Sequence, residues 1–431
     1  MLQEQEIKDT AAQTYLNLKQ YFAKSNNYWQ LGNAFDTMTD YLLLAGPSAA
    51  DPGLPKFVQA RFNDPAVQAY AGWYDDYAWW AIASAKAYDK RFAGIFGEYA
   101  GAFMGIAASC WAVLDQGKGD GVHLGGPQAF TNRDNQTMFV DPPAIPPYWA
   151  APRLDRGRGS GLHGVWQYDI FANKRELPNW VGPKEGNDDT NPSLPSLYWL
   201  GPYQNTVVNA LYFLLAMRLE QAHLDNVGVP TTAQQVADEY GFLRAWFGSD
   251  PANPISPGDS LLEQFGDGGI VVRERVSTYA FRNGAFPSVE NWDAETSWGG
   301  DQGMILNALT GYLRVHPSDP MPASLIQRLV RGYIVHMTNS AGEPQPYYPI
   351  TGNKLDGDYG DYKSGIGVFM RGLLQAYQTP GSPIISMVPT IEFQSFLRGS
   401  IKWATDLTQY DLFDSLNVLA TLIVAMAMLR T

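Results

Sequence analysis

The chain of 431 residues carries 30 Lys and Arg against 43 Asp and Glu, a formal net charge of −13. A basic surface that binds nucleic-acid phosphates would have to form against the negative electrostatic potential of this chain, so we exclude nucleic acid as a partner. Aromatic residues reach 13% of the chain while charged residues make up only 17%. Such rings are typical of surfaces that stack against sugar faces, although any one of them can equally fill a core.

The N-terminal residues lack the basic start and apolar core of a signal peptide and predict an amphipathic helix. The only cysteine, Cys110, excludes disulfides and multi-cysteine metal sites, and its apolar surroundings predict burial. The five histidines show no His-x3-His spacing, so we expect no metal cofactor. The most apolar segment, Val418–Leu429, is too short to span a bilayer, so we expect no membrane span.

Helical periodicity recurs from end to end, whereas strand-like alternation is nearly absent. The predicted helices are Glu4–Ala23, Asn33–Leu44, Asp76–Tyr88, Phe92–Leu114, Asn205–His223, Thr232–Trp246, Gln302–Val315, Ser324–Thr338, Gly365–Tyr377, Glu392–Thr408 and Leu412–Leu429. With a weaker segment near Lys56–Tyr70 there are about a dozen helices, which suggests six helical hairpins. We therefore predict an all-α fold, an (α/α)6 toroid that forms one domain over residues 1–431.

Several of these helices open with polar residues and continue as an apolar stripe, which predicts inner helices whose starts face one rim. The longest connection, residues 116–200, holds ten Pro and eleven Gly together with many aromatic residues. It is too broken for a packed helix pair and too aromatic for a linker, so we expect a folded loop over a cleft. The connections 248–300 and 340–362 are expected beside it.

Asp75 and Asp76 stand together among five aromatic residues at the start of a predicted helix. Two adjacent acids in a dry site would repel if both ionised, so the pKa of one should rise. A proton donor beside an anion is what glycosidic cleavage requires. An acidic pair that only complements the helix dipole is the alternative. The flanking aromatic residues Trp73, Tyr74, Trp79 and Trp80 are candidate sugar-binding residues.

The segment Trp73–Tyr88 resembles the Asp-Asp segment of glycoside hydrolase family 76, the endo-α-1,6-mannanases. Five further segments resemble this family in the same order, and the match runs from about Trp29 to Tyr377. Their residues are Trp29, Asn33 and Ala34; Gly164, Val165 and Trp166; Asn205, Asn209, Ala210 and Leu211; Asp301, Gln302 and Gly303; and Gly367 to Arg371, including Phe369.

The resemblance implies an (α/α)6 fold and a retaining double displacement, with Asp75 as nucleophile and Asp76 as general acid and base, although the two roles could be exchanged. It also implies substrate contacts from Trp29, Asn33, Trp166, Asn205, Asn209, Phe369 and Arg371. Gln204 stands where the family has Lys, and the insertion up to Leu200 reshapes the cleft. The mannan specificity is therefore less firmly indicated than glycoside hydrolysis.

Two loop regions supply the remaining candidate residues. Trp166, Tyr168 and Asp169 follow a Gly-rich stretch and could present a stacking ring beside a hydroxyl-binding carboxylate, or could simply pack. Trp298, Asp301 and Gln302 lie at a loop-to-helix junction, with Asp301 a candidate N-cap and Gln302 a candidate rim ligand.

The acidic loop with Asp356, Asp358 and Asp361 does not match an EF-hand, and we interpret it as solvated. We thus expect a retaining glycoside hydrolase acting on an α-linked, α-1,6-mannan-like polysaccharide or oligosaccharide. The alternatives are another toroid enzyme (an unsaturated-uronyl hydrolase, a lyase or an epimerase) and a catalytically silent glycan-binding protein. We expect a monomer, secreted or periplasmic by function, with a cytoplasmic location left open.

Overall fold

A computed structural model describes most of the helical part of the chain. The described residues are 4–71, 74–115, 128–131, 137–140, 206–247, 262–274, 296–349, 360–407 and 411–428.

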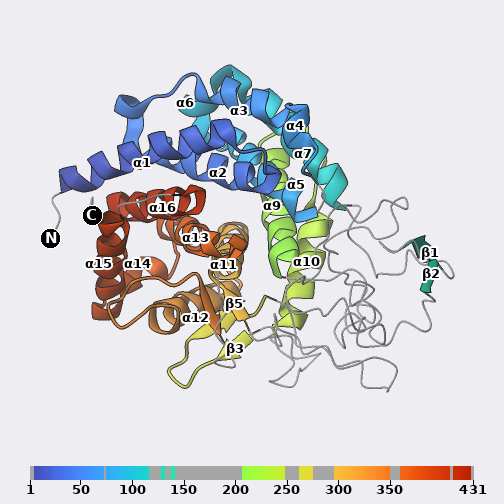
Figure 1. The fold of residues 1–431 in the computed structure, drawn as a ribbon. Helices are drawn as coiled ribbons and strands as arrows, with labels where there is room; N and C mark the ends of the chain where they lie inside the picture. The colour runs from blue at the N-terminus through green and yellow to red at the C-terminus, as the bar shows by residue number, and fades with distance from the viewer. Residues whose placement is uncertain are drawn as a thin grey trace.

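Six inner helices form a closed ring (Figure 1). Each packs against the next along the chain, and the last returns to pack against the first. The inner helices are α2 (Tyr28–Ala45), α5 (Tyr74–Ala85), α9 (Thr206–Leu224), α11 (Gly299–Val315), α13 (Gly365–Gln378) and α16 (Leu412–Met428).

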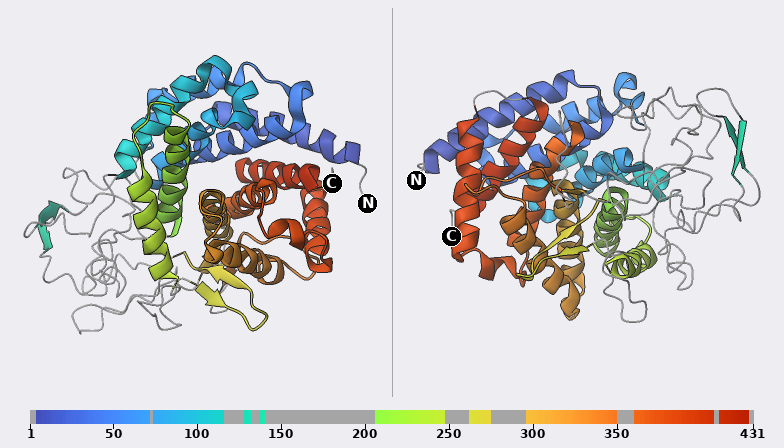
Figure 2. Two further views of the ribbon diagram at one scale, coloured as in Figure 1. Left: turned by 180° about the vertical axis from the view of Figure 1, so that it is seen from behind. Right: turned by 60° about the horizontal axis from the view of Figure 1, so that its bottom comes forward.

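An outer helix precedes each inner helix along the chain, and the outer helices surround the ring (Figure 2). They are α1 (Glu4–Lys24), α3 (Leu54–Phe62), α7 (Ala100–Leu114), α10 (Ala233–Trp246), α12 (Pro320–His336) and α15 (Ile391–Asp406). Six such pairs confirm the predicted (α/α)6 toroid. Among the described residues, none of the helices combines the length and the hydropathy that a membrane crossing requires.

The two rings differ in sequence pattern because they differ in burial. The outer helix α1 buries a single stripe that includes Ile7, Ala11, Leu18 and Phe22. By contrast, α16 is buried over most of its length, as expected for a helix enclosed by neighbours on all sides. Side-chain caps fix several starts; Asn27, for example, accepts a hydrogen bond from the backbone N–H of Gln30.

Short elements fill the connections. They are the helical turns α4 (Pro65–Gln68), α6 (Ala93–Phe96) and α14 (Ile384–Met387), the 3-10 turns η1 (Gly46–Ala49), η2 (Lys86–Tyr88), η3 (Lys90–Phe92), η4 (Gly97–Tyr99) and η9 (Gly360–Ser364), and three antiparallel strand pairs, β1 (Gln128–Thr131) with β2 (Thr137–Val140), β3 (Leu262–Gln264) with β4 (Ile270–Val272), and β5 (Thr296–Trp298) with β6 (Tyr347–Pro349).

The single helix predicted over Phe92–Leu114 is wrong in its first part. The chain there forms α6, ends it at Gly97 and restarts as α7. Gly97 has φ of 50°, a left-handed conformation that glycine adopts more readily than other residues and that cannot continue a helix. Cys110 is buried on α7 as predicted.

Candidate active site

The starts of the inner helices meet at one end of the ring. Trp29 in the first turn of α2 stacks on Phe413 of α16, with 5.8 Å between ring centroids. The Trp298 indole, just before α11, donates to the Tyr362 carbonyl oxygen before α13, at 2.9 Å. The backbone N–H of Gly367 donates to the Asn417 side chain of α16, at 2.7 Å. These contacts connect four of the six starts, as the shared polar openings predicted.

Asp75 and Asp76 occupy the first turn of α5, where free backbone N–H groups favour negative charge. Asp76 is buried, with 5% of its surface exposed, whereas Asp75 is half-buried. The Asp75 Oδ1 atom is buried without a hydrogen-bond partner. An unsatisfied acceptor beside a second carboxyl is costly to keep ionised.

The electrostatics of this pair favour one shared proton. Burial raises the pKa of Asp75 well above its usual range, and the neighbouring charge of Asp76 raises it further. Two carboxyls coupled this strongly titrate as a pair, so the pair retains one proton after an isolated aspartate would have lost it. Such a pair can supply one carboxylate and one carboxylic acid side by side.

A third acid adds to this field. Asp361, in η9, also raises the pKa of Asp75. Its side chain is exposed, as the interpretation of a solvated loop expects, yet its charge still acts on Asp75. Next to it, the Tyr362 hydroxyl donates to the Glu274 carboxylate. Sequence reasoning missed Glu274 and Tyr362, because nothing local marks residues that meet only across the ring.

The aromatic candidates separate by burial. Trp29 keeps part of its surface open, and it lies 6.5 Å from Trp79 by ring centroids. Tyr74, Trp79 and Trp298 are buried at this end, with 7%, 2% and 7% exposed. Phe413, which the sequence did not indicate, joins Trp29 in a stack.

The prediction that Trp80 binds sugar is corrected. Its ring is wholly buried, and its indole N–H donates to the Tyr28 carbonyl oxygen at 2.7 Å. Because the polar edge is used and no face is open, Trp80 is a core residue.

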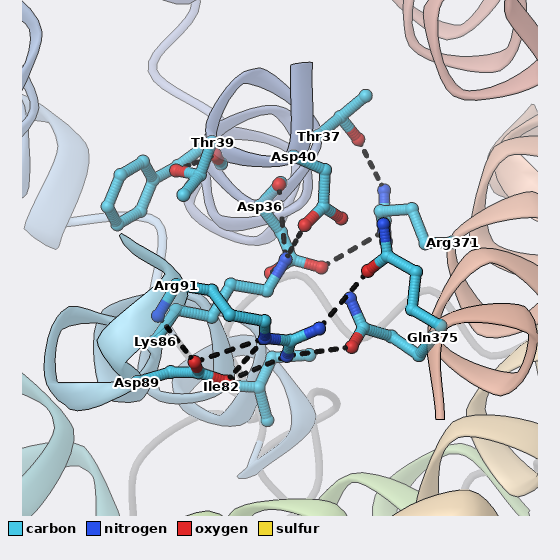
Figure 3. Close-up of polar contacts among 12 residues, drawn as sticks. Asp36, Thr37, Thr39, Asp40, Ile82, Lys86, Asp89, Arg91, Arg371 and Gln375 are labelled. Atoms are coloured by element: carbon cyan, nitrogen blue, oxygen red, sulfur yellow. Dashed lines mark hydrogen bonds and ion pairs between the residues drawn. The ribbon is translucent and has the colours of Figure 1, made fainter. Parts of the chain in front are cut away.

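Asn33 and Arg371 are buried in an internal network. Figure 3 shows the part of this network around Arg371, Asp36 and Lys86. The Arg371 guanidinium donates to the Asn33 side chain and to Thr37 Oγ1, the latter at 2.6 Å. It also pairs with Asp36 at 3.0 Å. Lys86 completes the network by pairing with Asp36 and Asp40. Asn33 and Arg371 therefore hold α2 against α13, which corrects their prediction as direct substrate ligands.

Phe369 and Asn209 are also wholly buried. The Phe369 ring stacks on Tyr333 with centroids 3.5 Å apart and an interplanar angle of 4°. This places Phe369 between α13 and α12, in the wall of the ring, away from any surface a sugar could reach.

The prediction of Gln302 as a rim ligand is also corrected. Its Oε1 accepts from the Val272 backbone N–H at 2.7 Å, and its Nε2 donates to the Val272 carbonyl at 2.6 Å and to the Trp298 carbonyl at 3.0 Å. The amide thereby ties β4 to the start of α11. Asp301, beside it, is wholly buried in the first turn of α11.

Five predicted substrate-binding residues lie outside the described residues. They are Trp73, Trp166, Tyr168, Asp169 and Asn205, and most of the predicted loop over a cleft, residues 116–200, lies outside them as well. Within the described part, no three His, Cys, Asp or Glu side chains are grouped so that they could hold a metal ion.

Comparison with solved structures identifies the fold. One similar structure is an α-1,6-mannanase of glycoside hydrolase family 76 from Salegentibacter sp. HEL1_6. It is an inactive variant in which two consecutive aspartates are replaced by asparagine, and it holds α-1,6-mannotriose. It superposes with a TM-score of 0.58 at 13% identity, over 99% of this chain and 100% of that chain. The Lin0763 protein of Listeria innocua gives 0.55 at 13% identity, over 100% and 99%.

A family 76 mannosidase, Bt3792 of Bacteroides thetaiotaomicron, gives a TM-score of 0.51 at 10% identity, over 98% of each chain. No family model and no curated protein matches the sequence. The chain thus has the fold of these structures over its whole length.

Proposed function

We propose that the protein is a glycoside hydrolase that cleaves an α-linked polysaccharide with retention, an α-1,6-mannan or a close relative, by means of Asp75 and Asp76. The observation that carries this proposal is the adjacent pair of carboxyls in the first turn of α5, at the end of the ring where inner-helix starts meet, where burial and the charge of Asp76 raise the pKa of Asp75. The shared fold supports the proposal, because the mannanase of that fold that holds mannotriose was made inactive by replacing two consecutive aspartates.

The chemistry needs one ionised and one protonated carboxyl. Retaining glycosidases place the two groups about 5 Å apart, so that one attacks the anomeric carbon while the other protonates the departing oxygen. Consecutive residues have Cα atoms about 3.8 Å apart, which lets their carboxyls flank one glycosidic bond at a helix start. The second carboxyl, now a carboxylate, takes a proton from a water molecule as that water attacks the anomeric carbon, which breaks the glycosyl ester, releases the sugar and restores the first carboxylate.

The roles within the pair follow from where the proton is when substrate binds. The family resemblance assigns Asp75 as nucleophile and Asp76 as acid and base. Because the two carboxyls titrate as a coupled pair, this assignment requires that Asp76 holds the shared proton when substrate binds. Trapping the glycosyl-enzyme with a fluorinated mannoside, followed by peptide mass spectrometry, identifies the esterified residue.

Aromatic surface near the pair supports a sugar ligand. Trp29 keeps part of its surface open at the end of α2 where Asp75 and Asp76 lie, and Phe413 stacks on one face of its ring. A ring fixed in this way can stack on a pyranose without losing rotamer freedom on binding.

The proposal is tested by reducing-sugar release from an α-1,6-mannan, an α-glucan and a polyuronate. We expect release from the mannan, with Asp75→Asn and Asp76→Asn each losing about 10³-fold or more. Asp406→Asn, the same change on an exposed side chain of α15, should keep full activity. Binding of a glycan without turnover would instead identify a silent glycan-binding protein.

A further inference from the structure

A second cavity opens at the opposite end of the ring. It has a volume of about 370 Å³ and lies where α5, α9, α11 and α13 end, a size at the lower end of small-molecule sites. Lys86, which lines it, directly follows the 12 residues of α5, so the cavity lies roughly 15 Å from Asp75 along the helix axis. It is therefore separate from the candidate active site.

The residues that line this cavity carry a net positive charge, opposite in sign to the net charge of the whole chain. Its charged residues are five cations and two acids, namely Lys86, Lys90, Arg91, Arg218 and Arg314 against Asp89 and Asp225. The whole chain, by contrast, has a net charge of −13. An excess of cations in a concave site of an acidic protein attracts anions to that site.

Three of the five cations, Lys90, Arg218 and Arg314, form no ion pair with a described carboxylate. Lys86 pairs with Asp36 and Asp40, at 2.8 and 2.7 Å, and Arg91 pairs with Asp89 at 2.7 Å. Among the residues that the structure describes, Arg218 and Arg314 have no carboxylate within 4.0 Å.

Arg218 instead donates to the Ile82 carbonyl oxygen. Burial lowers its pKa, and the nearby charge of Arg91 lowers it further, although acids including Asp36 act against both effects. An anion bound by both Arg218 and Arg91 would offset the repulsion between their guanidinium groups.

Gln375 supplies an independent sign of a missing partner (Figure 3). Its side chain is 8% exposed, and its Oε1 accepts from Arg91 Nη2 at 3.2 Å. Its Nε2 is buried without a hydrogen-bond partner. A buried amide donor left unsatisfied costs free energy, which an acceptor oxygen in the cavity would recover.

We propose that this cavity binds an anion of monosaccharide size, a sugar acid or a sugar phosphate, with its charged group between Arg218 and Arg91 and a further oxygen on Gln375 Nε2. Arginine suits this role because its planar fork of donors matches carboxylate and phosphate oxygens. Thr310 and Asn307 on α11 offer polar groups for the hydroxyls.

Isothermal titration of the full chain with galacturonate, mannose 6-phosphate and neutral mannose tests the proposal. We expect one saturable site per chain for at least one of the two anions, and the tighter of the two identifies the class of ligand. Mannose should bind at least about tenfold more weakly, since it lacks the charge-assisted hydrogen bonds.

Variants locate the site. Arg218→Gln, Gln375→Leu and the exposed Arg314→Gln should each weaken the anion by about tenfold, whereas Lys402→Gln, the same loss of charge on the exposed face of α15, should not. If Arg218→Gln fails to fold, the other two carry the test. Absence of anion binding would overturn the proposal and show that the cations only stabilise the helix ends. Equal binding of mannose and the anions, or equal anion binding by the parent and all the variants, would also overturn it.

Discussion

Gly303 and Gly372 face each other where α11 crosses α13. A Cβ added at Gly372 would lie 2.3 Å from the Gly303 carbonyl oxygen, and one added at Gly303 would lie 2.3 Å from the Val368 carbonyl oxygen. The backbones of the two inner helices therefore touch directly, with no room for a side chain between them. This contact sets the spacing of the ring wall that carries Asp301 at one end and Gln375 at the other.

Gly372→Ala should lower the free energy of unfolding by about 1–3 kcal/mol, because the methyl group forces the two backbones apart. Urea denaturation followed by circular dichroism measures this loss. Gly105→Ala is the matched control, since Gly105 is an exposed helical position with no atom within 4 Å of the added Cβ. It should stabilise by about 0.5–1 kcal/mol, and equal effects at both sites would contradict the account.

Arg371→Met should destabilise by about 3–5 kcal/mol, because it leaves the Asp36 carboxylate buried without its partner on α13. Lys86 and Arg371 together lower the pKa of Asp36 to about 2 against the opposing effect of burial. Lys402→Met, which breaks an exposed pair, should leave the stability nearly unchanged, because solvent screens such a pair. A small effect of Arg371→Met on the denaturation midpoint would show that the network is not structural.

Gln302→Leu should destabilise by about 1–3 kcal/mol, because the Val272 N–H and carbonyl groups both lose their partner in a buried site. The KM of the folded variant should stay near that of the parent. A raised KM with unchanged stability would restore the prediction of Gln302 as a substrate ligand.

The pH dependence of kcat/KM should show an alkaline limb. The raised pKa of Asp75 means that the pair holds its catalytic proton above the pH at which an isolated aspartate is ionised. Activity should therefore persist through that range and fall as the pH rises through the upper pKa of the pair. A profile with no loss of activity on the alkaline side would exclude a carboxylic acid as the proton donor.

The fold could be predicted because the signals are local and repeated. Apolar periodicity marks each helix, and shared polar openings indicate that the inner starts meet. The break at Gly97 was missed because Gly97 is one of four glycines in Phe92–Leu114, and nothing in the sequence distinguishes it from the glycines that stay helical in α7. The short strand pairs were missed because strands of three or four residues are too short to show alternation clearly.

The candidate site could be predicted only in part, because a sequence shows which residues are polar or aromatic but not which are enclosed. Asp75 and Asp76 were found because they are adjacent. Trp80 and Gln302 have the same residue types as sugar ligands, yet their polar groups are satisfied inside the protein. The contribution of Asp361 depends on a contact across the ring, between α5 and the start of α13.

The most direct test follows the anomeric proton by NMR while the purified protein acts on an α-1,6-mannan oligosaccharide. The account predicts that the first product released is the α-anomer, and that Asp75→Asn and Asp76→Asn release none while unfolding at the temperature of the parent. Release of the β-anomer, or unchanged release by either variant, would contradict a double displacement by this pair.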